Sequence, residues 1–152
     1  MASLLRIIAV GESVAEDIAL QWAVENGVSS AGSTVLRERF RKPPFFRSLE
    51  RLRQNTIDSD AMFLLTLSFG LGPEQKKVIE FLSAQHKPFL HLWSSVPLPG
   101  RLARHFLEMH KIKTLNVVGS TTESGDAIQT FVWSVFESIP IPATLSSQVP
   151  RK

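Results

Sequence analysis

The chain has 152 residues, about the length of one globular domain, and it contains no cysteine. Hydrophobic residues make up 43% and charged residues 20%, which is typical of a folded protein rather than a disordered one. The lack of cysteine excludes disulfides, thiolate catalysis and cysteine-based zinc sites. No apolar run approaches the ~20 residues of a membrane-spanning helix, so we expect a cytoplasmic protein without a membrane partner.

The net charge of +3 is unevenly distributed along the chain. Residues 37–53 hold seven basic and two acidic residues, so this segment carries +5 and the rest of the chain carries −2. Such a segment could contact phosphate or nucleic acid, with its phenylalanines stacking on bases. We favour a solvated connection whose aromatic residues cover a sheet edge or a neighbouring subunit, and therefore expect no nucleic-acid partner.

Short apolar runs alternate with stretches of helical periodicity, which is the pattern of βαβ units around a parallel sheet. In chain order, we predict a strand over residues 4–10, helices over 14–26 and 47–57, a strand over 61–67, a helix over 73–85, a strand over 88–92, a helix over 98–110, a strand over 114–118 and a helix over 123–138.

These elements predict a single α/β domain over residues 1–138, with a mostly parallel sheet and helices on both faces. Residues 139–152 are rich in Pro and Ser and are predicted to form a loosely ordered tail. The last helix has a wide apolar face, which could serve a subunit interface as well as the core. We therefore expect a homo-oligomer.

Ligands of open α/β sheets bind beyond the carboxyl ends of the strands. Three glycine-containing turns between a strand and a helix compete for that position in this chain. They are Gly11-Glu12-Ser13, the stretch SFGLGPEQ at residues 68–75, and the stretch GSTTES at residues 119–124. The sequence contains no nucleophile elbow, Walker loop or complete dinucleotide fingerprint. The four histidines show no i, i+4 pair, so we assign no metal site.

Four stretches of the sequence carry a resemblance to a known family. They read VGESVAEDIALQWAVENGV, RLRQNTIDSDAMFLL, KPFLHL and TLNVVG. These stretches resemble segments of the putative molybdenum carrier proteins, a Rossmann-like family related to the lysine-decarboxylase-like nucleotide-binding proteins. The similarity extends over roughly residues 4–138, and it implies a Rossmann-like three-layer fold.

The resemblance also implies a function. It suggests a non-catalytic protein that holds a phosphate-bearing or nucleotide-like ligand, such as the molybdenum cofactor, at the carboxyl edge of the strands. The cofactor is implied by the resemblance alone. The residues expected to line the ligand are Gly11, Glu12, Ser13, Arg51, Asn55, Gly70, Gly72, Glu74, Gly119, Ser120 and Thr121.

The ligand turns differ from the family pattern more than the rest of the chain does. The family's first turn reads approximately GGQTGAD, whereas this chain keeps one glycine and places Glu12 where the family has an amide. The second turn has PEQ at residues 73–75 in place of Gly-Gly-Thr. The third turn, GST at residues 119–121, lacks the arginine of the family's Gly-Pro-Arg.

The acidic residues of these turns have a local explanation. Ser13 with Glu16, and Ser120 with Glu123, have the spacing of a capping box, in which serine and glutamate satisfy backbone N–H groups at a helix start. Pro73 has no N–H to offer. We therefore expect each helix start to be satisfied by its own side chains, so an incoming phosphate would meet carboxylates and fewer free donors.

Two other classes of function stay open. One is a degenerate family member that acts as an oligomeric protein-interaction module. The other is a nucleotide glycosidic-bond hydrolase in which Glu12 or Glu74 faces the sugar, although this chain has GLGPEQ where related phosphoribohydrolases carry PGGxGTxxE. The pair Asp58 and Asp60 could serve acid–base chemistry or bind a cation. We favour a turn or cap before the following strand.

Overall fold

The computed structural model describes residues 4–31 and 44–140. Part of the basic segment, residues 37–43, and the predicted tail from residue 141 onward lie outside the described residues. The elements are β1 (Arg6–Ile8), α1 (Val14–Glu25), β2 (Ser29–Ala31), α3 (Pro44–Asp58), β3 (Ala61–Thr66), α4 (Pro73–Ala84), β4 (Phe89–Trp93), α5 (Pro99–Met109), β5 (Thr114–Gly119) and α6 (Asp126–Glu137).

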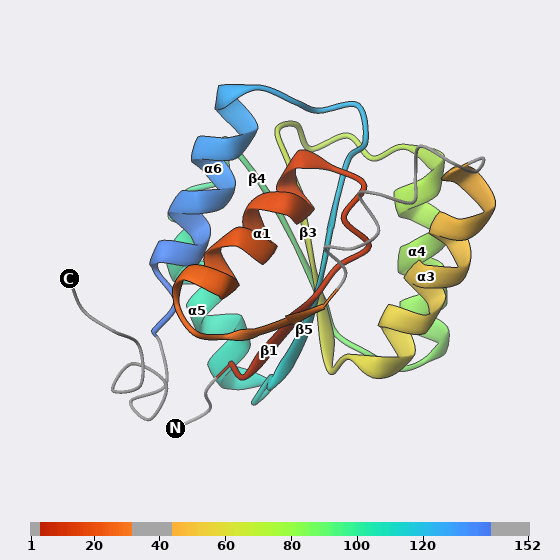
Figure 1. Ribbon diagram of the computed structural model, residues 1–152, viewed down its shortest axis with the longest axis horizontal. Coiled ribbons are helices and arrows are strands. Elements are labelled where there is room, and N and C mark those ends of the chain that lie inside the picture. Colours follow the sequence, from red (N-terminus) through yellow and green to blue (C-terminus); the bar gives the residue numbers. More distant parts are fainter. Residues whose placement is uncertain (1–3, 32–43, 141–152) are drawn as a thin grey trace.

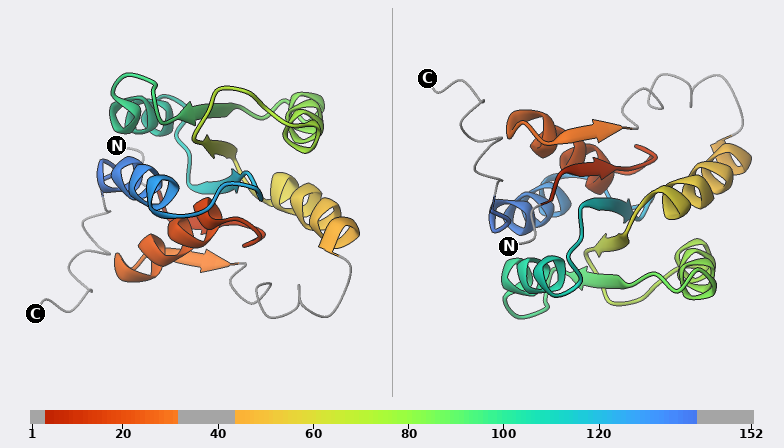
Figure 2. Two further views of the ribbon diagram at one scale, coloured as in Figure 1. Left: turned by 90° about the horizontal axis from the view of Figure 1, so that it is seen from above. Right: turned by 90° about the horizontal axis from the view of Figure 1, so that it is seen from below.

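The five strands form one sheet in the order β2-β1-β5-β3-β4, and all neighbouring pairs are parallel. Helices α1, α5 and α6 cover one face of the sheet, and α3 and α4 cover the other (Figures 1 and 2). This arrangement confirms the predicted three-layer, Rossmann-like α/β fold. Within the described parts of the chain, no helix is long and apolar enough to cross a membrane.

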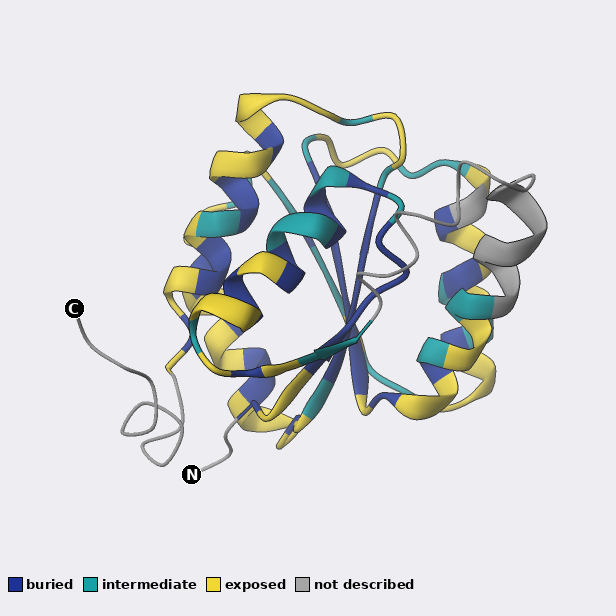
Figure 3. Cartoon of the chain, in the orientation of Figure 1, coloured by how far each residue is buried: buried dark blue, intermediate teal, exposed yellow. Residues whose placement is uncertain are grey.

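The centre of the sheet is buried beneath helices on both faces (Figure 3). Strand β3 reads AMFLLT and is buried at every position, as expected for a strand covered by helices on both sides. Phe63 and Leu65 pack into the larger core beneath α1, α5 and α6. Met62 and Leu64 pack into a smaller core beneath α3 and α4. The five apolar side chains of this strand, Ala61 to Leu65, therefore each contribute to one of the two cores.

Most predicted elements are confirmed with small shifts at their ends. Strand β2 was not predicted, because its three residues, Ser-Ser-Ala, show no apolar alternation. Helix α6 begins at Asp126, three residues later than predicted, after Gly125 with φ of 94°. The wide apolar face of α6 packs against α1 and α5 within the chain. Its buried residues are Ile128, Phe131, Val132, Val135 and Phe136.

The end of α3 is tied to the start of β4 by one side chain. The Lys87 ammonium donates hydrogen bonds to the carbonyl oxygens of Thr56 at 2.7 Å, Ile57 at 2.7 Å and Ser59 at 2.6 Å. Carbonyl groups at a helix end lack partners within the helix, and the negative end of the helix dipole favours a cation there. Lys87 therefore caps α3 with both its charge and its hydrogen bonds.

We expect the substitution Lys87→Met to lower the free energy of unfolding by about 1–2 kcal/mol, because it removes a charged donor from three carbonyl groups. Urea denaturation measures the change. Lys76→Met removes the same charge from an exposed position on α4, and we expect it to change the free energy by less than about 0.5 kcal/mol. Equal losses in the two variants would show that the contacts of Lys87 do not stabilise α3.

Candidate functional site

The strand order places a ligand-sized crevice at the middle of the sheet. Strands β3 and β5 are neighbours, yet β3 leads into α4 on one face and β5 leads into α6 on the other (Figure 1). Loops that leave adjacent strands toward opposite faces open a crevice at the carboxyl edge, where ligands of such sheets bind. A crevice of about 520 Å³ lies here, lined by Thr66, Ser68, Gly70, Gly72, Pro73, Gln75, Lys77, Ser120, Thr121, Thr122 and Glu123.

Several predicted site residues meet in this crevice. Gly70 and Gly72 come from the turn after β3, and Ser120 and Thr121 come from the turn after β5. A side chain at Gly70 would meet no atom within 4 Å, so the turn leaves open space at this point. The structure thus brings together the second and third of the three turns that the sequence singled out.

The crevice also contains residues that sequence analysis missed. Thr66 is the last residue of a buried apolar strand, where a hydroxyl group faces the carboxyl edge. Lys77 lies one helical turn after Pro73, the first residue of α4. Thr66 lies close to the end of the predicted strand, and Lys77 lies four residues after the start of the predicted helix. A search of the sequence for polar residues at strand ends and in the first turns of the following helices could have found both.

The first turn is organised around a buried carboxylate. Glu16 is 3% exposed, and its Oε1 accepts hydrogen bonds from the N–H groups of Gly11 at 2.9 Å and Glu12 at 3.3 Å. Its Oε2 accepts from the Ser13 hydroxyl at 2.7 Å and from the Gly119 N–H at 3.1 Å. The backbone donors at the ends of β1 and β5 therefore converge on an anion that the chain itself supplies.

The close approach of the two turns depends on a glycine. A Cβ built on Gly119 would lie 2.6 Å from the Cβ of Ala15 and 2.6 Å from the Oγ of Ser13. Neither neighbour can move far, because Ser13 begins α1 and Ala15 is buried against the sheet. The absence of a side chain at residue 119 is thus required for the Gly119 N–H to reach Glu16.

The two predicted capping boxes have different outcomes. The Ser13 hydroxyl accepts from the Glu16 N–H at 3.2 Å, which confirms the serine half of the first box, whereas the Glu16 carboxylate accepts from the N–H groups of Gly11 and Glu12 rather than completing the predicted box. The second box is wrong. Ser120 pairs with the Thr122 hydroxyl at 2.9 Å, and Glu123 accepts from the N–H of Leu67 at 2.9 Å. The Glu123 carboxylate joins the turn after β5 to the end of β3, and α6 begins three residues later.

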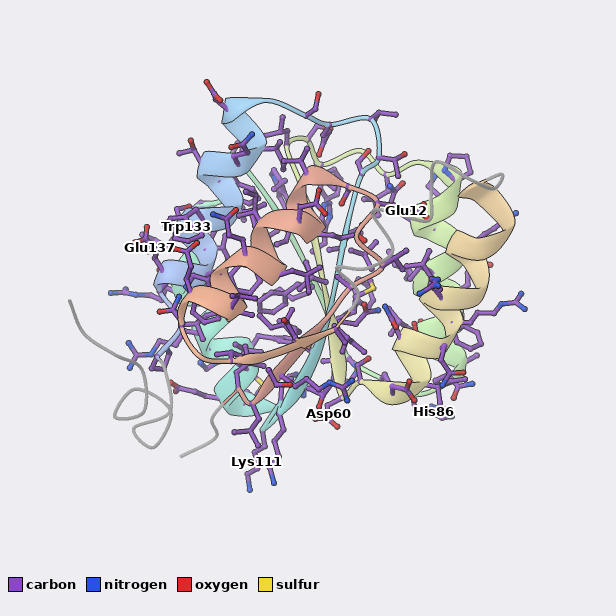
Figure 4. The ribbon with its side chains drawn as sticks, in the orientation of Figure 1. Glu12, Asp60, His86, Lys111, Trp133 and Glu137 are labelled. Atoms are coloured by element: carbon purple, nitrogen blue, oxygen red, sulfur yellow. The ribbon has the colours of Figure 1, made fainter. Side chains whose placement is uncertain are left out.

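Glu12, Arg51 and Asn55, which were also predicted to contact the ligand, are not among the described residues of the crevice lining. The Glu12 side chain lies at the carboxyl edge of the sheet (Figure 4), and its N–H donates to Glu16. Arg51 and Asn55 are half-buried on α3. Glu74 is the second residue of α4. Arg51 and Asn55, whose spacing matches the pattern of the resembled family, therefore lie on α3 rather than in the described crevice lining.

The aspartates before β3 have backbone partners at the other edge of the sheet. Asp60 lies far from Glu12, at the amino ends of the strands (Figure 4). Its Oδ2 accepts from the N–H groups of Lys113 at 3.0 Å and Thr114 at 2.9 Å. Asp58 accepts from the side-chain amide of Gln54 at 3.0 Å. These contacts agree with the favoured interpretation of a turn or cap before the strand.

Burial raises the pKa of the Glu16 carboxyl, because its charge is poorly solvated inside the protein. The hydrogen bonds from Ser13, Gly119, Gly11 and Glu12 act in the opposite direction and lower the pKa. Among the described residues, no group of three or more His, Asp or Glu side chains is placed to hold a metal ion.

We expect the substitution Glu16→Gln to lower the free energy of unfolding by about 1–3 kcal/mol, because the amide nitrogen cannot accept from the Gly119 N–H. A raised pKa in the folded state means that the carboxyl stabilises the fold most below its unfolded value of 4.5, and loses this contribution as the pH rises through the folded-state pKa. Glutamine does not titrate. The cost of the substitution should therefore be largest near pH 4.5 and smaller at about pH 7.

Urea denaturation across this pH range measures the cost, with Glu80→Gln, at an exposed position on α4, as the control. We expect the control to cost less than about 0.5 kcal/mol throughout the range. A cost of Glu16→Gln that grows with pH would contradict the expectation. It would show that the hydrogen bonds outweigh burial and lower the pKa of Glu16.

Comparisons with known proteins agree with this fold. A search of curated proteins found no match. A crystal structure of a putative molybdenum carrier protein from Syntrophus aciditrophicus is similar, with a TM-score of 0.66 and 16% identity over 90% of this chain and 95% of that chain. This likeness shows a shared fold and confirms the resemblance found in the sequence. A model of the circularly permutated YpsA SLOG family matches residues 7–139. The chain therefore belongs to the circularly permutated YpsA SLOG family.

Proposed function

We propose that this protein binds a small phosphate-bearing or nucleotide-like ligand in the crevice between β3 and β5, without converting it chemically. The observation that carries the proposal is the position of this crevice at the point where the connections of neighbouring strands diverge. The first turn, by contrast, uses its donors on Glu16. The ligand site is therefore assigned to the second and third turns.

The lining offers both kinds of polar group that such a ligand needs. Lys77 supplies an amine that can pair with a phosphate, and the hydroxyls of Thr121 and Thr122 can donate to its oxygens. Glu123 supplies carboxylate oxygens with capacity for further donors, such as the hydroxyls of a sugar. Among the described lining residues, one cation, one anion and several hydroxyls suit a ligand with separate anionic and hydroxyl parts.

The contacts of the carboxylates favour binding over catalysis. Glu123 is the one carboxylate whose side chain is described in the lining, and it already accepts from the Leu67 N–H. Glu12, one of the two carboxylates that the hydrolase alternative could use, is not among the described lining residues, and the side chain of the other, Glu74, lies outside the described part of the chain. The similar structure is that of a protein named as a putative molybdenum carrier, which supports including the molybdenum cofactor among the ligands tested.

Native mass spectrometry of freshly purified protein and thermal-shift titration with nucleotides, molybdate and the molybdenum cofactor test the proposal. We expect a copurified phosphate-bearing molecule or a saturable shift in melting temperature. The substitution Lys77→Ala should weaken binding about three- to tenfold, because it removes the amine from the lining. The same charge removed by Lys76→Ala, at the neighbouring exposed position, should leave the affinity within about twofold.

The mass spectrum also reports the number of subunits, for which we propose a homo-oligomer. A ligand-free protein that shows no shift with any of these compounds would contradict the binding proposal. It would favour the alternative of a protein-interaction module. Binding that Lys77→Ala and Lys76→Ala weaken equally would place the ligand outside this crevice.

A further inference from the structure

An exposed aromatic ring stands at the rim of the crevice. Phe69 is 68% exposed and lies between Ser68 and Gly70, both of which line the crevice. Its ring meets the edge of Trp93 with centroids 4.8 Å apart and stacks on His91 at 6.0 Å. Trp93 and His91 both belong to β4, the strand at the edge of the sheet. The three rings form one aromatic cluster beside the crevice.

Hydrogen bonds hold the two residues that precede Phe69 in its turn. The Leu67 N–H donates to Glu123 at 2.9 Å, and the Leu67 carbonyl accepts from the Ser94 hydroxyl at 2.7 Å. The Ser68 carbonyl accepts from the Thr66 hydroxyl at 2.7 Å. These bonds fix the backbone on the N-terminal side of Phe69. A ring presented by a braced turn loses little freedom when it binds a partner.

The aromatic cluster and the crevice share a wall. The Thr66 hydroxyl lies 2.8 Å from Nε2 of His91, and Thr66 also lines the crevice. The hydroxyl has one hydrogen, which it donates to Ser68, so the Nε2–H of His91 is the donor to Thr66. Burial lowers the pKa of His91 and so favours the neutral ring, and the hydrogen bond to Thr66 places the hydrogen of that ring on Nε2. His91 thus supports both Trp93 and the crevice wall.

We propose that Phe69, supported by Trp93 and His91, stacks against the aromatic base of a nucleotide whose phosphate and sugar lie in the crevice. The inference rests on the proposed function and specifies its ligand class. The hydroxyls and the amine of Lys77 suit the phosphate and sugar, while the apolar ring at the rim suits a planar heterocycle. Stacking on an aromatic side chain tolerates different bases, so we assign no base preference.

The test compares ligands with and without a base. Isothermal titration calorimetry measures the affinity of the protein for the 5′-monophosphates of adenosine, guanosine, cytidine and uridine, and for ribose 5-phosphate. We expect at least one nucleotide to bind about tenfold more tightly than ribose 5-phosphate. Phe69→Ala should remove that difference and leave the affinity for ribose 5-phosphate unchanged, whereas Phe69→Tyr should preserve it.

Phe89→Ala is the matched control. Phe89 is also an exposed phenylalanine of the β4 region, with 36% exposure, but it stands at the start of the strand rather than at the carboxyl edge. We expect this variant to bind nucleotides like the unmodified protein. Because Phe69 is exposed, its replacement should leave the melting temperature nearly unchanged, and thermal unfolding of each variant verifies this.

The other outcomes are distinguishable. Equal affinities for ribose 5-phosphate and every nucleotide, or an unchanged preference in Phe69→Ala, would overturn the stacking role and leave the crevice proposal in place. If Phe69→Ala weakened the binding of nucleotides and of ribose 5-phosphate equally, the stacking role would likewise be overturned. The ring would then affect the crevice and not the base. Failure of the unmodified protein to bind any of these phosphates would overturn the stacking inference, and the crevice proposal would fail with it only if molybdate and the molybdenum cofactor also gave no thermal shift.

Discussion

The arrangement of the carboxyl edge depends on the hydrogen bonds of one buried carboxylate. Glu16 accepts from backbone donors at the ends of β1 and β5, two strands that are more than a hundred residues apart in sequence. It also fixes the serine that begins α1. Burying a charged or polar group costs free energy unless its hydrogen-bonding capacity is used, and here both oxygens have two donors each. A single side chain therefore holds the first turn, the first helix and the central strand together.

This interaction divides the edge into a closed half and an open half. Over β1 and β5, the donors that face the helix start of α1 are already used by the chain. Over β5 and β3, the turns diverge and leave a crevice with hydroxyls, one amine and open space at Gly70. The two halves touch at β5, because Gly119 bonds to Glu16 while the next residue, Ser120, lines the crevice. The closed half thus fixes the position of one wall of the open half.

The sequence predicted the layers and most elements because their signals are local. Strand β3 is an uninterrupted apolar run, and α1 has a serine cap before it and Asn26-Gly27 after it. The failures involve contacts between distant parts of the chain. Glu123 has the spacing of a capping box, yet its partner is Leu67, 56 residues away. For Glu16, the spacing to Ser13 predicted the local contact at the start of α1. It could not predict the hydrogen bond from the N–H of Gly119, which lies 103 residues away in the sequence.

The glycine at residue 119 also has a consequence for how relatives of this chain can be sorted. A side chain there would collide with Ala15 and Ser13, so the hydrogen bond from the N–H of residue 119 to Glu16 requires a glycine. Relatives that lack the acid have three backbone donors to satisfy by other means, with water or a bound anion as candidates. We therefore expect an acid at residue 16 together with a glycine at residue 119 to mark chains whose first turn is filled by their own side chain.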